Sequence, residues 1–323
     1  MMRSSGGTKR VIHIFTAAVL AFPTAAGTAE PRLPVDLTSH ETAQYNVDHT
    51  PGGLTLSGTA SSQGFYVSPP TATPFPVMGI RTATSATRPA GTGIVVELRG
   101  QSVSGGWTEW RTATADSSVI QLPEYARSVQ ARITFSGKEH LGKPAVVSLY
   151  ISPLGSHDPR PERQANLKPF SSRVYATRIG LVGERTANGH VIRRRDRFAS
   201  LPSRRGLNSD DTTNDYVVEI CYSRTNRCAR APVWDVGPWN LRDDYWNPPA
   251  SREMWQDLPQ GKPQAQAAYA DGYNQGKDER SRKVLNPAGI DLANGLFWDD
   301  LGMTGNDWVT VTYLWTGSAA DDS

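Results

Sequence analysis

Between about residue 60 and residue 152 the chain alternates apolar and polar residues, and no helical periodicity interrupts this pattern. The runs GIVVELRG and ARITFSG predict half-buried strands, and AVVSLYIS closes the region with a more apolar run. Because a period of two places one face of each strand in a core, the strands are expected to pair as antiparallel sheets. We predict an N-terminal antiparallel β-sandwich over 60–153, preceded by an extended lead-in over 30–59.

A stretch rich in proline and charge, LGSHDPRPERQANLKPF, follows and lacks periodicity. This composition is typical of a linker, which we place at 154–170. A second domain is expected over 171–317, before a short tail at 318–323. It opens with RVYATRIG and closes with WVTVTYLW, and the closing run alternates between two faces. One short helix is predicted at KPQAQAAYADG, because Pro263 suits a first helical turn and Gly272 a stop.

The first 29 residues have the organisation of a secretory signal peptide. Arg3, Lys9 and Arg10 precede the apolar run VIHIFTAAVLAF, and TAAGTA supplies small residues for cleavage, most simply after Ala29. No later apolar run approaches the roughly 20 residues that a spanning helix needs. We therefore predict a protein without a membrane span that is secreted, extracellular or associated with a cell wall.

Export changes the charge balance of the chain. The chain has 34 Lys and Arg and 31 Asp and Glu, and the predicted signal peptide holds three of the basic residues and none of the acidic ones. The mature chain is thus formally neutral, which gives no electrostatic case for a nucleic-acid partner. A local basic run, RRRDR at 193–197 with Arg204 and Arg205 nearby, is either a solvated face or a patch for an anionic polymer.

Cys221 and Cys228 are the two cysteines of the chain, and they lie on strand-like runs around the polar loop SRTNR. In an exported protein such a pair is usually oxidised, so we predict a disulfide that closes a hairpin. The six histidines are scattered without the spacing of a zinc site, and no nucleotide-binding motif occurs. We expect neither a metal nor a cofactor.

The segment APVWDVGPWNLRDDYW places Asp235 among four aromatic side chains, Trp234, Trp239, Tyr245 and Trp246. Two interpretations are open. A carboxyl group in an apolar groove keeps its proton and can donate it to a glycosidic oxygen. A carboxylate at a tight turn can instead accept backbone N–H bonds and perform no chemistry.

Four motifs of the second domain, GERTANGHVI, FASLPS, VWDVGPW and GIDLANGLFWDDLG, occur in this order. The set resembles the double-psi β-barrel of rare lipoprotein A and of the expansin and barwin group. The resemblance implies a small six-stranded barrel with a groove for glycan strands, and so an all-β chain. Members of this group include lytic transglycosylases that cut peptidoglycan, wall-loosening proteins that do not hydrolyse their polymer, and protease inhibitors.

The chain departs from the family pattern in three places. His190 stands where an acidic residue usually follows the glycine of the TA-x-G segment, and Phe198 stands where a histidine is common, so that only Asp235 of D-x-G-P is retained. The chain also inserts roughly fifty residues between Asn240 and Gly289, including the predicted helix. We expect this partly helical insert to form a lobe over the groove.

The predicted site has three candidate catalytic residues: Asp235 as the acid, His190 as its partner and Asp291 as a second carboxylate. His190 is alternatively a loop residue, and Asp291 a turn aspartate. The predicted sugar-stacking residues are Trp234, Trp239, Tyr245, Trp246, Trp107 and Trp110.

Trp107 and Trp110 belong to GGWTEWR in the N-terminal domain. Together with GIVVELRG, this motif is similar to the β-sandwich modules that precede amidase domains in secreted actinobacterial wall enzymes. The two tryptophans either form a face for sugars or fill the core of the sandwich.

Three functions are open at this point. The first is a wall-associated protein that engages peptidoglycan or a related polysaccharide and cuts it, as a lytic transglycosylase or a glycoside hydrolase. The second is a non-catalytic, expansin-like polysaccharide-binding protein. The third is a secreted protease inhibitor on the same barrel, with NLRDDYWNPP as its exposed loop.

Overall fold

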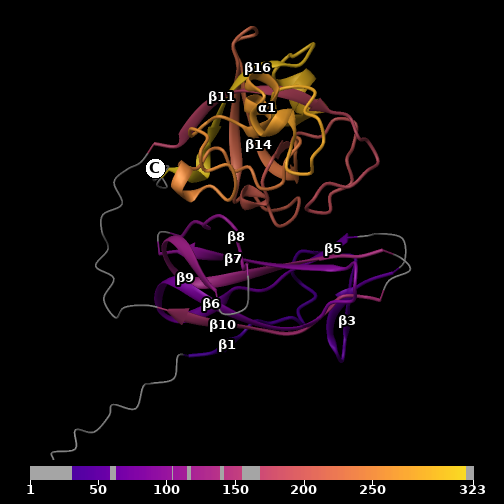
Figure 1. Ribbon diagram of the computed structural model, residues 1–323, viewed down its shortest axis with the longest axis vertical. Helices are drawn as coiled ribbons and strands as arrows, with labels where there is room; N and C mark the ends of the chain where they lie inside the picture. Colours follow the sequence, from indigo (N-terminus) through magenta and orange to yellow (C-terminus); the bar gives the residue numbers. More distant parts are fainter. Residues whose placement is uncertain are drawn as a thin grey trace, which may run out of the picture. The chain divides into compact units, whose positions relative to one another are not determined.

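The computed structural model describes residues 31–58, 63–103, 105–114, 118–138, 142–154 and 168–317. The predicted signal peptide, most of the predicted linker and the tail lie outside these residues. The described chain is mostly β-structure and contains a closed six-stranded barrel, which confirms the expectation from the sequence. Figure 1 draws the N-terminal strands in indigo to magenta, and the strands and helix of the second domain in magenta to yellow.

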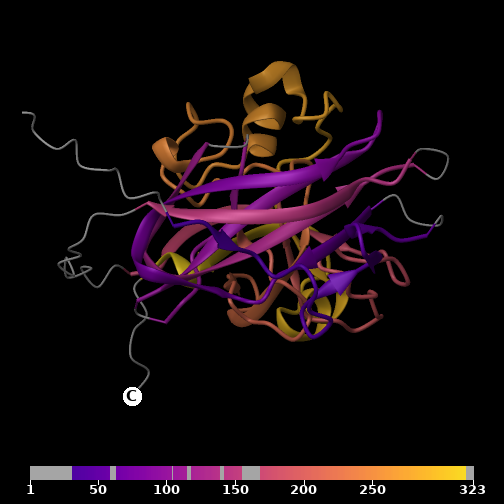
Figure 2. The same cartoon turned by 90° about the horizontal axis from the view of Figure 1, so that it is seen from below.

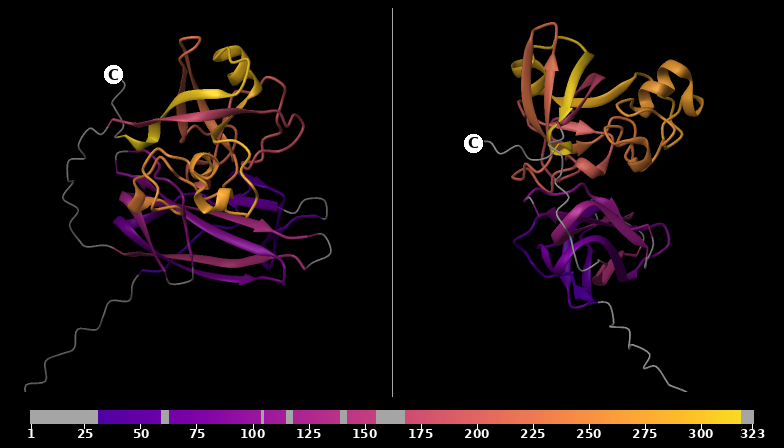
Figure 3. Two further views of the ribbon diagram at one scale, coloured as in Figure 1. Left: turned by 45° about the horizontal axis from the view of Figure 1, so that its top comes forward. Right: turned by 90° about the vertical axis from the view of Figure 1, so that its left-hand side faces the viewer.

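Ten antiparallel strands form one sheet, which we call the N-terminal sheet. Its strands are β1 (Leu33–Pro34), β2 (Gln44–Tyr45), β3 (Val47–Thr50), β4 (Gly53–Leu56), β5 (Gln63–Val67), β6 (Thr71–Thr87), β7 (Gly93–Ser102), β8 (Arg111–Thr112), β9 (Val119–Ser136) and β10 (Ala145–Leu154). The long strand β9 is its centre, because it pairs with β5, β6 and β7. The long strands cross the view in Figure 2, and Figure 3 shows that the sheet curves until it is nearly closed.

The segment predicted as a lead-in is part of this sheet. β1 pairs with β10, β2 pairs with β5, and β3 and β4 form a hairpin beside β10. Leu54 and Leu56 of β4 are buried in the core of the sheet. These strands are only two to four residues long, so the segment has too few alternating residues for the sequence to indicate a strand.

Six strands close into the barrel. In order around it they are β11 (Phe170–Ile179), β15 (Ala288–Ala293), β12 (Ala199–Leu201), β14 (Arg227–Val236), β13 (Val217–Tyr222) and β16 (Asp307–Tyr313). β11 and β15 are parallel, and so are β12 and β14. The other four neighbouring pairs are antiparallel.

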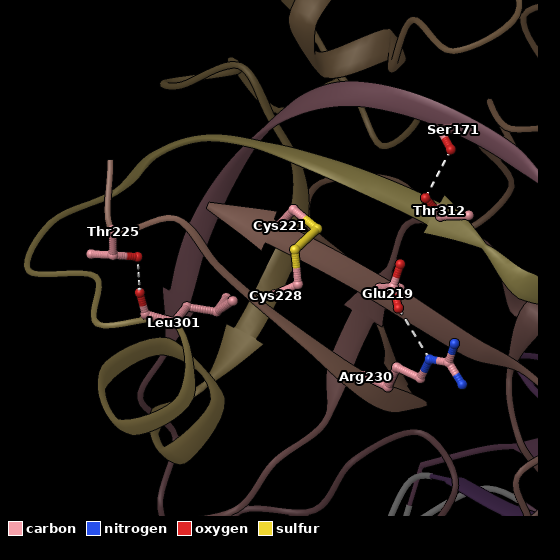
Figure 4. Close-up of a disulfide and its surroundings, with 8 residues drawn as sticks. All are labelled: Ser171, Glu219, Cys221, Thr225, Cys228, Arg230, Leu301 and Thr312. Atoms are coloured by element: carbon pink, nitrogen blue, oxygen red, sulfur yellow. Dashed lines mark hydrogen bonds and ion pairs between the residues drawn. A yellow bond between two sulfur atoms is a disulfide. The ribbon is translucent and has the colours of Figure 1, made fainter. Parts of the chain in front are cut away.

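The predicted disulfide between Cys221 and Cys228 is confirmed, and it closes the hairpin of β13 and β14 (Figure 4). Glu219 and Arg230 form an ion pair across the same hairpin, at 3.1 Å. The Thr225 hydroxyl in the loop donates to the Leu301 carbonyl (2.6 Å), which attaches the hairpin end to a neighbouring turn. For so short a loop the disulfide stabilises the fold by about 2–3 kcal/mol.

The predicted helix is also confirmed, as α1 (Gln264–Asp271). Gly272 ends it in the left-handed conformation (φ 68°), and its N–H donates to the Ala267 carbonyl. Short 3₁₀ and π turns occur at η1 (Arg204–Gly206), η2 (Pro249–Ser251), η3 (Tyr273–Gly276), η4 (Gly295–Asp300) and η5 (Leu314–Thr316). In the described part of the chain no helix is long and apolar enough to cross a bilayer.

The N-terminal sheet and the barrel share one core cluster. Phe65, Val67 and Trp110 of the N-terminal region pack with barrel residues such as Tyr216. At the same interface the buried Arg132 makes a two-pronged ion pair with Glu97 (2.7 and 2.8 Å). The Arg132 guanidinium also donates to backbone carbonyls of residues 204 and 207, on the barrel side. We call this contact the sheet–barrel interface.

Candidate active site

Four polar side chains form a row across neighbouring barrel strands. Thr177 of β11 is in register with Asp291 of β15, and Ser200 of β12 is in register with both Asp291 and Asp235 of β14. We call Thr177, Asp291, Ser200 and Asp235 the polar row. It brings together two of the three predicted catalytic residues, although Asp235 and Asp291 are far apart in the sequence.

Strand alternation places the row on the face of the strands that is turned away from the barrel core. Ile290 and Leu292, on either side of Asp291, belong to the core cluster. The same holds for Ala199 and Leu201 on either side of Ser200. Since neighbouring residues of a strand point to opposite faces, Asp291 and Ser200 share the outer face.

Asp235 reaches this face through a register shift. Ala199 pairs with Val233, but the next residue, Ser200, pairs with Asp235, so β14 advances two residues while β12 advances one. Such a bulge turns the following side chain to the other face of the strand. Val233 therefore stays in the barrel core, and Asp235 joins Ser200 on the outer face.

Asp235 is partly buried. Burial raises its pKa from 3.8 to about 6, against the opposing effect of two backbone N–H groups, those of Ala187 and Val236. The Ala187 N–H donates to Asp235 Oδ1 at 2.8 Å. The carboxyl group is therefore held in one orientation and keeps its proton to nearly neutral pH.

Asp291 has a similar environment. Burial raises its pKa to about 7, and the neighbouring Asp235 charge adds to the shift, against a hydrogen bond from the Thr177 hydroxyl. Asp235 and Asp291 lie on either side of one strand, so about two strand spacings, roughly 9–10 Å, separate their Cα atoms. Two carboxyl groups that retain protons near neutral pH and lie close enough to interact form a candidate acid–base pair.

Gly237 leaves space beside this pair. A Cβ at residue 237 would lie 3.4 Å from the Ser200 hydroxyl oxygen and 3.9 Å from Asp291 Oδ2. The Ser200 hydroxyl donates to the Gly237 carbonyl at 3.3 Å. Ser200 and Thr177 are the residues of this site that sequence reasoning missed. The alternation within FASLPS indicates an outward Ser200, but nothing local in the sequence pairs it with two acids.

His190 is not the partner of Asp235, and that prediction is wrong. Its Nδ1 lies 2.7 Å from Asp211 Oδ2 and its Nε2 lies 2.7 Å from Asp196 Oδ2. Because both ring nitrogens contact other carboxylates, the ring has no nitrogen left for Asp235. The buried Phe198, at the position where the family has a histidine, packs against Trp234 with ring centroids 5.5 Å apart.

Trp234 and Trp239 are partly buried and pack in two different places. Trp234 lies against Phe198 and His190, in a small cluster at the ends of β11 and β15. Trp239 packs on α1, and its Nε1–H donates to Asn286 Oδ1 at 3.1 Å. Each therefore has part of its ring in a cluster and part at the surface.

Tyr245 and Trp246 cannot stack on a sugar in this structure, which corrects that prediction. Their exposed fractions are 0% and 1%, and both belong to the core cluster. The Tyr245 hydroxyl donates to the Gly289 carbonyl at 3.0 Å, and the Trp246 Nε1–H donates to Glu109 at 2.6 Å. The start of the insert is thus packed into the fold rather than laid over a groove as a separate lobe.

About half of the loop proposed for protease inhibition is also buried. Asn240, Asp243 and Asp244 have no exposed surface. Asp243 pairs with the buried Arg252, and Asp244 with Arg205. Arg242 and Pro248 of this loop are exposed, while the two ion pairs fix it against the fold, so protease inhibition stays a prediction.

Trp110 is also buried, which corrects its assignment to a sugar-binding face. The guanidinium carbons of Arg99 and Arg132 each lie 4.4 Å from its ring, and its Nε1–H donates to the Leu207 carbonyl at 3.1 Å. It belongs to the sheet–barrel interface and not to the sandwich core alone. Trp107 is partly exposed, with Arg99 over its ring at 4.3 Å.

Among the described residues, two cavities lie at the sheet–barrel interface. One, of about 520 Å³, is lined by residues 40–45 and Phe65 of the N-terminal region and by barrel-side loops that include His190. The other, of about 580 Å³, is lined in part by Trp107, Trp246 and Trp315. Asp235 and Asp291 line neither of these two cavities.

The arginines at 193–197 are partly neutralised by ion pairs. Arg195 contacts Asp299 at 2.8 Å, and Arg197 contacts Asp300 at 2.9 Å. Arg204 turns instead toward Glu97 at the sheet–barrel interface. These contacts favour the solvated-face interpretation over an anion patch. In the described residues, no group of three or more His, Cys, Asp or Glu side chains is arranged to hold a metal ion.

Comparison with known proteins gives one match for this region. No curated protein matches the chain. A family model described as a domain of unknown function (DUF8814) matches residues 170–312, a range that contains the whole polar row and all six barrel strands except the last residue of β16.

Proposed function

We propose that this is a secreted, cell-wall-associated protein that binds peptidoglycan or a related polysaccharide and cleaves it with the acid pair of the polar row. The observation that carries the proposal is that Asp235 and Asp291 flank Ser200, both with pKa values raised by burial, to about 6 and about 7. Cleavage of a glycosidic bond needs a proton donor at the leaving oxygen, and a carboxyl group that stays protonated supplies it.

The assignment of the barrel to the double-psi class of rare lipoprotein A and the expansins is part of this proposal. It is supported by the order of the four sequence motifs and by two parallel strand pairs within a closed six-stranded barrel. The antiparallel pairing of the N-terminal sheet, which curves around a single core cluster, supports its assignment to a module of the β-sandwich kind. The predicted signal peptide and the disulfide support export.

In the proposed reaction the Asp235 carboxyl group donates its proton to the glycosidic oxygen as the C1–O bond breaks. In a lytic transglycosylase the 6-hydroxyl of the same sugar then bonds to C1. Its proton returns to the Asp235 carboxylate, and the product carries a 1,6-anhydro ring. One carboxyl group is sufficient for this route.

Asp291 favours a second route, inverting hydrolysis. There one of the two carboxyl groups protonates the leaving oxygen, while the other, ionised, takes a proton from a water molecule that attacks C1 and leaves an ordinary reducing end. Inverting enzymes place their carboxyl groups about 6.5–9.5 Å apart, and two carboxyl groups on alternate neighbouring strands suit such a separation. The two routes therefore differ in their products and in their need for Asp291.

The test uses the chain without its predicted signal peptide, on peptidoglycan sacculi and on glycan strands without stem peptides. Mass spectrometry distinguishes 1,6-anhydro ends from reducing ends. We expect cleavage by the wild type and a loss of about 10²–10⁴-fold in Asp235→Asn, the contribution of a general acid. Asp299→Asn, at an exposed ion pair of the same barrel, is the matched control and should retain activity.

The effect of Asp291→Asn separates the routes. Anhydro products that persist in this variant indicate a transglycosylase, whereas reducing ends that disappear indicate hydrolysis by the pair. Retention of the wild type on sacculi without any product would replace catalysis by non-catalytic, expansin-like binding. If the wild type gives no product and is not retained on sacculi, the glycan proposal is refuted.

A further inference from the structure

The cavity of about 520 Å³ has the features of a binding site, and none of its lining residues belongs to the polar row. It lies between the N-terminal segment 40–45 and the barrel-side loops 185–193 and 210–211. Its volume falls within the roughly 300–1,000 Å³ that is typical of small-molecule sites.

Asn188 in the wall of this cavity has an unpaired donor. Its side chain is 4% exposed, and its Oδ1 accepts hydrogen bonds from the Thr186 hydroxyl (2.6 Å) and the His190 N–H (3.3 Å). Its Nδ2 is buried and has no hydrogen-bond partner among the residues that the structure describes. Buried amide groups are almost always paired, so this one points to an acceptor supplied from outside the chain.

Two guanidinium groups line the same cavity. Arg185 is held in place, because its Nη1 donates to the Gly189 carbonyl at 2.8 Å and its guanidinium lies 4.7 Å from the Tyr45 ring centre. Arg193 is the second cation. Guanidinium groups next to an amide donor make a suitable environment for a carboxylate.

Three carboxylates line the cavity as well, Glu41, Asp210 and Asp211. His190, also in the wall, has Asp211 on one ring nitrogen and Asp196 on the other. The acidic side chains oppose a ligand that carries only negative charge, but they offer partners to an ammonium group. The lining therefore has donors for a carboxylate and acceptors for an amine.

We propose that this cavity binds a zwitterionic amino acid or short peptide, with its free carboxylate near Asn188 and the arginines and its free ammonium near the acids. The proposal does not depend on glycan cleavage. Where the polymer is peptidoglycan, its stem peptides carry this chemistry.

The test is isothermal titration calorimetry of the full mature chain with the dipeptide alanylalanine, in its L,L and D,D forms. The controls are the same dipeptide blocked at the amine by acetylation, blocked at the carboxylate as the amide, and blocked at both ends. We expect the free dipeptide to bind and each blocked form to bind at least about tenfold more weakly, because each lacks one charged hydrogen-bonding group. No binding of either free form, or equal binding of the doubly blocked form, overturns the proposal.

Variants of the lining residues test whether the dipeptide binds in this cavity. Arg193→Gln removes a lining cation, whereas Arg194→Gln removes its neighbour, which does not line the cavity. We expect weaker dipeptide binding in the first variant and unchanged binding in the second. Asn188→Asp keeps the oxygen that accepts from Thr186 and replaces the unpaired donor with a carboxylate oxygen, so it should also weaken binding. If Arg193→Gln and Asn188→Asp bind as the wild type does, the ligand lies elsewhere and the proposal fails.

Discussion

The sheet–barrel interface and the polar row both bury acidic side chains, but with opposite consequences. At the interface, burial alone would raise the pKa of Glu97, yet Arg132 and Arg204 outweigh it and hold the pKa below its usual value. In the polar row, burial raises the pKa of Asp235 and of Asp291, and neither shift has an arginine among its causes. The two regions therefore differ in whether an arginine contacts the buried acid.

Glu109 is a second buried acid at the interface whose pKa is lowered by neighbouring arginines. Burial would raise its pKa, but Arg111 and Arg205 lower it, as do hydrogen bonds from the Trp246 and Trp315 indoles, at 2.6 and 2.9 Å. An ionised carboxylate with this many donors fixes neighbouring side chains and has little capacity for proton transfer. A buried acid without a cation retains a proton that it can donate.

The largest expected effect is at the interface. Glu97→Gln leaves Arg132 buried without its counter-ion, which should lower the free energy of unfolding by about 3–5 kcal/mol. The measurement is urea unfolding at pH 7. Glu219→Gln, which breaks the exposed pair with Arg230, should cost less than about 1 kcal/mol. Similar losses in the two variants would contradict the structural role of Glu97.

Removing an acid from the polar row should raise the free energy of unfolding above pH 7, whereas removing Glu97 should lower it. The unfolded chain releases the Asp291 proton near pH 3.8 and the folded chain near pH 7, so folding stability is lost as pH rises between these values, by up to about 4 kcal/mol. Asp291→Asn removes this loss and still accepts the Thr177 hydrogen bond. We expect the variant to unfold at higher urea than the wild type at pH 8 and to match it near pH 4. A variant less stable than the wild type at pH 8 would show that Asp291 is ionised and paired.

A smaller effect tests the aromatic side of the interface. Trp110→Phe keeps a ring between Arg99 and Arg132 but loses the hydrogen bond to the Leu207 carbonyl, which should cost about 1–3 kcal/mol. Trp298→Phe, at a side chain that is 39% exposed, should change stability by no more than about 0.5 kcal/mol. Thermal unfolding of the two variants makes this comparison.

The smallest expected effect concerns the pH dependence of the proposed glycan cleavage. If Asp235 is the proton donor, its active form is protonated, and kcat/KM should fall about tenfold for each pH unit above about 6. The measurement is the rate of product release from glycan strands between pH 4.5 and 8.5. A rate that increases throughout this range would exclude Asp235 as the proton donor.

The parts of the fold that were predicted correctly depend on short stretches of sequence. The disulfide hairpin needs only two strand-like runs and a polar loop, and α1 needs only Pro263, an alanine-rich run and Gly272. The six-stranded barrel was predicted only from a family resemblance, which rests on the order of four motifs over the whole second domain. The strands of segment 30–59 were missed because they are too short to show a period.

The candidate site was predicted only in part. Asp235 and Asp291 were named, but the sequence also favoured His190, which the structure places between Asp196 and Asp211. Aromatic residues were the main source of error. Tryptophan and tyrosine combine a large apolar surface with one polar atom, so they suit a buried interface as well as a sugar-binding surface.

By itself the sequence determined long alternating strands such as β7, β10 and β16, the helix, the disulfide and the presence of an acid at the D-x-G-P turn, because each depends on residues within about one turn or hairpin. Only the tertiary structure decided which acids meet. The bulge in β14 turns Asp235 to the face that Asp291 reaches from a strand more than fifty residues later, with Ser200 between them. Register and burial also decide where the cations lie: arginines hold the pKa of Glu97 and Glu109 below the usual value, and no arginine does so at Asp235 or Asp291.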